Sequence, residues 1–149
     1  MKKKFIDAHM QVAEVYAQLS SAQRLKVGCV AVKNDTIIGI GYNGMPSGWD
    51  NKCEVDISEV VDIDGRSVTP AQNVTRPEVL HAETNCLAKI SRSTNSSEDA
   101  YLFVTHAPCL QCAKLIYQSG IKSIFYRNDY RDSSGVEFLK KCKVEVNKL

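Results

Sequence analysis

His81-Ala82-Glu83 and Pro108-Cys109-Leu110-Gln111-Cys112 are the two stretches that decide the fold and the chemistry of this chain. Imidazole and thiolate are ligands that zinc prefers, and a catalytic zinc site uses three protein ligands and keeps a fourth position open. Residues three apart at the start of a helix point to the same side, so both cysteines can reach one ion. The two stretches therefore predict a zinc site made of His81, Cys109 and Cys112.

Glu83 lies two residues after His81 and is not needed as a ligand. A carboxylate beside a metal-activated water can accept its proton and pass it to a ring nitrogen, so we predict that Glu83 is the catalytic residue. An isolated CxxC is also typical of a structural zinc half-site, a redox pair or two buried thiols. The combination with His81 and Glu83, and without a fourth Cys or His nearby, favours an open catalytic site.

The hydrophobic spacing predicts the elements around these motifs. Helices are expected over residues 5–19, 81–90, 108–120 and 135–141, where apolar positions recur at three and four residues. Strands are expected over residues 27–32, 36–40, 101–105, 123–126 and 144–146, the first two as a hairpin. Strands alternating with helices predict an α/β fold, a three-layer α/β/α sandwich with a mixed five-stranded sheet.

Size and composition indicate one domain over residues 1–149. Residues 43 to about 80 have no convincing periodic pattern, and we interpret them as a long loop that acts as a lid or binds a ligand. A net charge of +2 argues against a nucleic-acid or membrane surface. Six cysteines without a secretion signal suggest reduced thiols and a cytoplasmic protein, in the host cytoplasm if the chain is viral.

With these motifs the chain resembles the deoxycytidylate (dCMP) deaminase family of the zinc-dependent cytidine deaminases. The resemblance covers almost the whole chain, through VGCVAV at 27–32, GYNGMPSG at 41–48, HAETN at 81–85 and PCLQCAK at 108–114. The glycine-rich string is the most discriminating of these. The resemblance implies a cytidine deaminase-like fold and a hydrolase that converts dCMP and water to dUMP and ammonia, supplying dUMP for thymidylate synthesis.

The resemblance also implies substrate-binding residues. Asn43 would contact the sugar, and the backbone around Ala82 and the segment before Pro108 would line the base pocket. A monophosphate needs cationic or hydroxyl donors. The candidates for the phosphate are Ser20, Ser21, Arg24 and Lys26, with Tyr130 as a further candidate for the phosphate or for stacking on the base. For each of these, a solvated surface residue is the alternative.

Many members of the family are activated by dCTP and inhibited by dTTP, which bind with Mg²⁺ near the glycine-rich loop, and form hexamers. By resemblance, the candidates for such an allosteric site are Lys26, Gly44, Asp50 and Glu54. Arg92 occupies a position that some members use at a subunit contact, although an ordinary helix-end charge is the alternative. A homo-oligomer, and a hexamer in particular, is therefore expected.

Ala22 marks a departure from several relatives. Those relatives bind a second, structural zinc through a cysteine before the first strand, another after the glycine-rich loop, and His or Cys residues of the long insertion. Here the first position is Ala22, and neither His nor Cys occurs between Glu54 and Leu80. Cys53 alone cannot hold zinc, so we predict one zinc ion per subunit.

Three other functions remain open from the sequence. A free-nucleoside cytidine deaminase usually has cysteine where His81 stands, and it needs no phosphate pocket. A nucleic-acid cytidine deaminase is expected to carry a more basic or aromatic surface than a charge of +2 and 7% aromatic residues provide. A zinc-ordered nucleotide-binding module without catalysis is the alternative of another class.

Overall fold

A mixed five-stranded sheet forms the centre of the computed structural model, which describes residues 1–57, 60–61, 67–69 and 72–149. The strands lie in the order β2 (Thr36–Tyr42), β1 (Gly28–Lys33), β7 (Tyr101–His106), β8 (Ser123–Asn128) and β9 (Glu145–Lys148). β1 pairs antiparallel with both β2 and β7, whereas β7, β8 and β9 run parallel to one another. The predicted sheet is confirmed.

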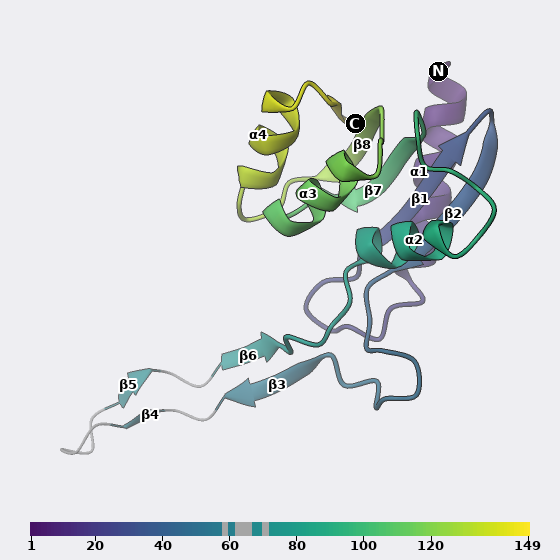
Figure 1. The fold of residues 1–149 in the computed structure, drawn as a ribbon. Helices are drawn as coiled ribbons and strands as arrows, with labels where there is room; N and C mark the ends of the chain where they lie inside the picture. The colour runs from purple at the N-terminus through teal and green to yellow at the C-terminus, as the bar shows by residue number, and fades with distance from the viewer. Residues whose placement is uncertain (58–59, 62–66, 70–71) are drawn as a thin grey trace.

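Helices cover both faces of the sheet and complete the three layers (Figure 1). α1 (Lys3–Ala17) lies on one face, and α2 (Ala82–Ser91), α3 (Leu110–Gln118) and α4 (Ser134–Lys141) lie on the other. Because side chains alternate along a strand, Val30 packs in the cluster below α1, while Cys29 and Ala31 pack in the cluster below α2 and α3. No described helix is long and apolar enough to cross a membrane.

Two backbone features fix the position of β2 relative to β1 and α2. Asn34 and Asp35 have φ angles of 50° and 58°, which suits the two-residue turn of a tight hairpin and joins β1 to β2. At Gly41 a Cβ atom would lie 2.2 Å from the carbonyl oxygen of Ala82. Only glycine therefore allows the first turn of α2, which carries Glu83, to approach β2 this closely.

The segment between β2 and α2 differs from the expected irregular loop. β3 (Glu54–Ile57) pairs antiparallel with β6 (Gln72–Thr75), and β4 (Val60–Val61) pairs with β5 (Ser67–Thr69). Together they form an arm that projects away from the five-stranded sheet (Figure 1). The prediction of no regular element was wrong for these strands, because their pairing joins positions far apart in sequence and their many polar residues give little hydrophobic pattern.

Candidate active site

The three predicted metal ligands meet where α2 and α3 begin. His81 is the N-cap of α2, Cys109 is the N-cap of α3, and Cys112 lies in the first turn of α3. His81 Nδ1 lies 3.6 Å from Cys109 Sγ and 3.3 Å from Cys112 Sγ. Tetrahedral zinc with Zn–S of about 2.3 Å and Zn–N of about 2.0 Å requires N and S to lie about 3.5 Å apart. The donor set therefore fits zinc, and the three residues form a zinc-binding site.

The electrostatics of the site suit a cation. A hydrogen bond from the Cys112 thiol, aided by His81, lowers the pKa of Cys109 to about 3. The same hydrogen bond, together with burial, raises the pKa of Cys112, so that the pair holds one proton. The hydrogen bond with Cys109 raises the pKa of His81. Binding of a divalent cation replaces such protons, since the metal takes the deprotonated ligands.

Glu83 lies in the first turn of α2 and is only 4% exposed. Burial raises the pKa of its carboxyl group, although its backbone hydrogen bond and the nearby His81 act in the opposite direction. The side chain lines the same pocket as His81 and Cys109. The structure thus brings the predicted proton carrier next to the metal ligands and shields it from bulk water.

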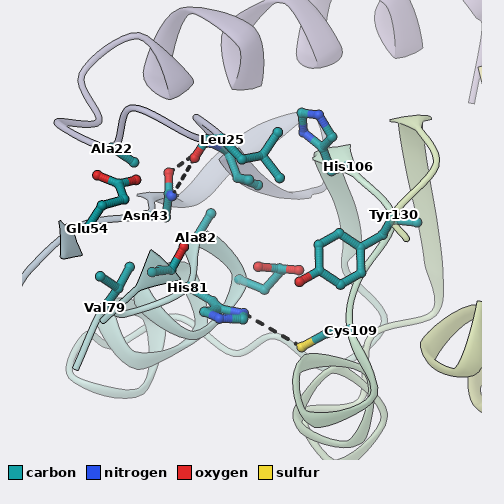
Figure 2. Close-up of a pocket in the computed structure, with 14 residues that line it drawn as sticks. Ala22, Leu25, Asn43, Glu54, Val79, His81, Ala82, His106, Cys109 and Tyr130 are labelled. Atoms are coloured by element: carbon teal, nitrogen blue, oxygen red, sulfur yellow. Dashed lines mark hydrogen bonds between the residues drawn. The ribbon is translucent and has the colours of Figure 1, made fainter. Parts of the chain in front are cut away.

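The pocket above these residues is mostly apolar, with a few polar groups that converge on it. Asn43, Ala82 and Tyr130, which were predicted to bind substrate, all line it. The remaining lining residues are Ala22, Leu25, Val27, Glu54, Thr75, Val79, His81, Glu83, His106, Ala107 and Cys109. Figure 2 shows Tyr130 directed towards the interior of the pocket. We call this the inner pocket.

A second, wider depression adjoins the inner pocket, and we call it the outer cleft. His106, Cys109 and Tyr130 are among the residues that line both. The outer cleft adds three guanidinium groups, those of Arg24, Arg76 and Arg131. Arg76 forms ion pairs with Asp50 and Glu78, and Arg131 lies against the ring of Tyr130 at 5.6 Å. A ligand in the inner pocket can therefore extend an anionic group towards Arg24 and Arg131.

The other predicted phosphate residues are not placed in the cleft. Ser20 is 3% exposed, and its hydroxyl oxygen accepts the N–H of Ala22. Ser21 lies 3.4 Å from Cys53 Sγ through its hydroxyl, and Lys26 is exposed. None of the three is among the residues that line the inner pocket or the outer cleft, and the serines make local contacts where the chain turns towards β1. The phosphate role of Ser20, Ser21 and Lys26 stays a prediction.

The four predicted allosteric residues do not gather at one place. Gly44 lines a separate depression together with residues of the glycine-rich loop. Asp50 is paired with Arg76, and the Glu54 carboxylate accepts the N–H groups of Gln23 and Arg24 at 3.0 and 3.1 Å. Glu54 thus belongs to the wall of the inner pocket and not to the depression at Gly44. Arg92, predicted at a subunit contact, is the exposed C-cap of α2.

His106 lies in the segment before Pro108 that the resemblance assigns to the base pocket, and it lines that pocket together with Ala107, although the sequence does not single it out as a site residue. It is the last residue of β7, three positions before Cys109, and it carries no motif of its own. A sequence signal did exist, because side chains at the end of a strand that leads directly into a metal-binding helix tend to face the site. Leu25 and Thr75 were missed because they come from segments with no regular pattern.

Ala22 lies in a small apolar cluster. Ala22, Cys53 and Val79 are buried together, and Met45 packs against them. Among the residues that the structure describes, His81, Cys109 and Cys112 form the group of three side chains close enough to share one metal ion. One zinc ion per chain remains a prediction.

A three-layer sandwich whose two helix starts supply His and two Cys beside a buried Glu defines the zinc-dependent deaminase class. Residues 3–128 match the family described as cytidine and deoxycytidylate deaminase zinc-binding region. The chain therefore belongs to this family.

Three individual proteins illustrate the similarity to this family. A dCMP deaminase of the cyanophage S-TIM5, solved in complex with dCMP and dUMP, is 41% identical with a TM-score of 0.86, covering 100% of this chain and 99% of that one. Human deoxycytidylate deaminase is 35% identical over 83% of this chain, and ComE operon protein 2 of Bacillus subtilis is 31% identical over 82%. This chain spans 65% and 58% of the lengths of those two proteins.

Proposed function

We propose that the protein is a dCMP deaminase, which hydrolyses dCMP to dUMP and ammonia. The observation that carries the proposal is the placement of the buried Glu83 beside His81 and Cys109, at a pocket that adjoins an arginine-lined cleft. The similarity over the full length to a cyanophage enzyme whose structure contains dCMP and dUMP supports the choice of substrate.

The residues of the chain divide the reaction between them. Zinc held by His81, Cys109 and Cys112 would lower the pKa of a water towards about 7 and make it a nucleophile for a ring carbon. Glu83 would take one proton from that water and deliver it to the ring nitrogen N3, where it remains in the product, and would then pass the second proton, that of the new C4 hydroxyl, to the amine that leaves as ammonia. Its burial favours this exchange, because a raised pKa makes the carboxylate a stronger base towards the water and brings it closer to the pH at which it must both accept and return a proton.

Asn43 fixes the wall of the pocket on which the sugar would rest. Its Oδ1 accepts the N–H of Val27 and its Nδ2 donates to the carbonyl oxygen of Leu25, both at 2.8 Å. The amide nitrogen has a second hydrogen that these bonds do not use. We therefore assign Asn43 to the sugar, and Val27 and Ala82 to the walls around the base.

Arg24 and Arg131 are the groups we assign to the phosphate. Guanidinium groups bind phosphate oxygens through paired, charge-assisted hydrogen bonds. Both arginines line the outer cleft, and Tyr130 links this cleft to the inner pocket. A nucleoside monophosphate would place its base near Glu83 and its phosphate near these arginines.

The test is to compare turnover of dCMP, deoxycytidine, CMP, dCTP and single-stranded DNA by the zinc-loaded protein. We expect dCMP to be the preferred substrate, with Glu83→Gln as the inactive control. Equal kcat/KM values on deoxycytidine and dCMP would contradict the phosphate assignment. Absence of turnover of every cytosine compound, with nucleotide binding unchanged in Glu83→Gln, would instead favour a non-catalytic binding module.

Regulation and assembly are the parts of the proposal that rest on the family resemblance. The depression at Gly44 also contains Asn85 and Lys89, so it offers polar donors outside the inner pocket. Measuring dCMP turnover with dCTP or dTTP and Mg²⁺ tests regulation, and the mass of the particle in solution tests the expected hexamer. An unchanged rate with both effectors would remove regulation from the proposal without affecting the deaminase assignment.

A further inference from the structure

Thr105 and His106, at the end of β7, form a hydrogen-bonded chain with β1. The backbone N–H of Gly28 donates to Thr105 Oγ1 at 3.1 Å, and Thr105 Oγ1 lies 3.1 Å from His106 Nδ1. Thr105 is only 4% exposed, so its hydroxyl hydrogen needs a partner within the protein.

The direction of this chain determines which ring nitrogen of His106 carries hydrogen. Gly28 N–H is a donor and occupies one lone pair of the Thr105 oxygen. Among the residues that the structure describes, His106 Nδ1 is the partner left to accept the hydroxyl hydrogen. A neutral imidazole has one donor and one acceptor nitrogen, so acceptance at Nδ1 places the hydrogen on Nε2. Burial lowers the pKa of His106, which keeps the ring neutral.

The ring lies where the inner pocket meets the outer cleft. His106 lines both, as does Leu25, and Figure 2 shows His106 on the same side of the pocket as Tyr130. The backbone is held on both sides of it, because Asn128 donates its side-chain N–H to the carbonyl of Thr105 and Ala107 donates its N–H to the carbonyl of Asn128. The imidazole is therefore held in place at the junction between the inner pocket and the outer cleft.

We propose that His106 donates its Nε2–H to an oxygen of the pentose phosphate of the bound nucleotide, and that Thr105 is a positioning residue that sets the tautomer. The proposal rests on the proposed function, because it takes the ligand to be a nucleoside monophosphate. A neutral donor at this place complements the arginines, since it binds an oxygen without adding another charge to the cleft.

The tautomer can be tested without activity. Nitrogen-15 NMR of the imidazole rings distinguishes hydrogen on Nε2 from hydrogen on Nδ1. We expect His106 of the wild-type protein and of Thr105→Ser to carry it on Nε2, and Thr105→Val to show a mixture of tautomers. Hydrogen on Nδ1 in the wild-type protein would overturn the proposal.

Binding of the product dUMP, measured by calorimetry on the zinc-loaded protein, tests the contact itself. His106→Phe should weaken dUMP binding roughly ten- to a hundredfold, the effect of losing a hydrogen bond to a polar or charged oxygen. His106→Gln, which keeps an N–H donor at a similar position, should bind within a few-fold of wild type. If His106→Phe weakens the binding of deoxyuridine as much as that of dUMP, the acceptor is a sugar oxygen. If it weakens the binding of dUMP alone, the acceptor is a phosphate oxygen.

Two results separate this proposal from the proposed function. Wild-type affinity for dUMP in His106→Phe, with normal zinc content and thermal unfolding, would overturn the role of His106 while leaving the deaminase assignment intact. Wild-type protein that binds dUMP but does not turn over dCMP would instead contradict the proposed reaction. For Thr105, the serine and valine variants distinguish a positioning role from packing. Positioning predicts normal dUMP binding in Thr105→Ser, weaker binding in Thr105→Val, and a changed pH dependence of the KM for dCMP in Thr105→Val.

Discussion

The side-chain amide of Asn43 donates to the carbonyl oxygen of Leu25 at 2.8 Å and so joins the end of β2 to the segment that precedes β1. Its oxygen binds the N–H of Val27 in the same way. One side chain therefore holds two of the residues that line the inner pocket.

Asn43→Ala should reduce both stability and substrate binding. It leaves the N–H of Val27 and the carbonyl of Leu25 without their partner, which should cost about 1–3 kcal/mol in the free energy of unfolding. Denaturant unfolding and the KM for dCMP measure the two effects. Asn95→Ala, an exposed change away from the pocket, is the control and should alter neither. An Asn43→Ala protein with wild-type stability would show that these bonds contribute nothing.

Glu83→Gln should keep the fold and the metal but lose turnover by roughly a hundred- to ten-thousandfold, because the amide cannot carry the proton. Glutamine has almost the same shape, so zinc content and the melting temperature should stay close to wild type. The measurement is kcat for dCMP beside metal analysis. Residual activity within a few-fold of wild type would assign proton transfer to another group.

Metal analysis should find about one zinc per chain. Cys112→Ser should lower zinc content, because it removes one of three ligands, whereas Cys53→Ala should leave it unchanged, because Cys53 packs with Ala22 and Val79. A value of two, reduced to one by Cys53→Ala, would mean that the apolar cluster at Ala22 does hold a second ion.

Arg131→Gln should raise the KM for dCMP about tenfold or more and leave turnover of deoxycytidine unchanged, since only the monophosphate offers the charged oxygens that a guanidinium binds. Lys114→Gln, which removes a charge from the exposed side of α3, is the matched control and should have no effect. Equal losses on the nucleoside and the nucleotide would place Arg131 away from the phosphate.

His9 should make the fold less stable in mild acid. Its Nε2 is buried without a hydrogen-bond partner among the described residues, and burial lowers its pKa although Asp35 opposes the shift. The unfolded chain therefore binds a proton more readily than the folded one, and stability falls as pH drops below the unfolded pKa of about 6.5. His9→Leu should lose less stability than wild type between about pH 7.5 and about pH 5.5 in denaturant unfolding. If the free energy of unfolding of His9→Leu falls with pH as steeply as that of the wild type, the prediction is wrong.

Much of the fold could be predicted because its signals are local. The periodicity of α1, the turn at Asn34 and Asp35, and the strands that precede α3 and α4 all depend on neighbours in sequence. The pairing of β3 with β6 could not be predicted, since Glu54 and Thr75 meet through a ladder between distant segments. The alternation of Glu54, Val55, Asp56 and Ile57 covers four residues only, which is too short to identify a strand without its partner.

The residues of the candidate site also differ in how well the sequence predicts them. His81, Cys109 and Cys112 were predictable because metal chemistry restricts both residue type and spacing. Phosphate contacts have no such restriction, and any serine or cation near a strand is a candidate from sequence. Ser20 has the right chemistry, but folding uses its hydroxyl for the N–H of Ala22. His106 acquires its place only when the end of β7 meets β1.

Glu54 is the first residue of β3 and lines the inner pocket. Its carboxylate accepts the N–H groups of Gln23 and Arg24 at the base of the arm. The base of the arm is thereby anchored to the wall that faces the substrate. For protein engineering this places a natural boundary at Ile57 and Gln72, where the ladder that begins with Glu54 ends. Of β3 and β6, Glu54 and Thr75 line the inner pocket, so a chimera that exchanges the arm together with Glu54 would alter the pocket of the parent.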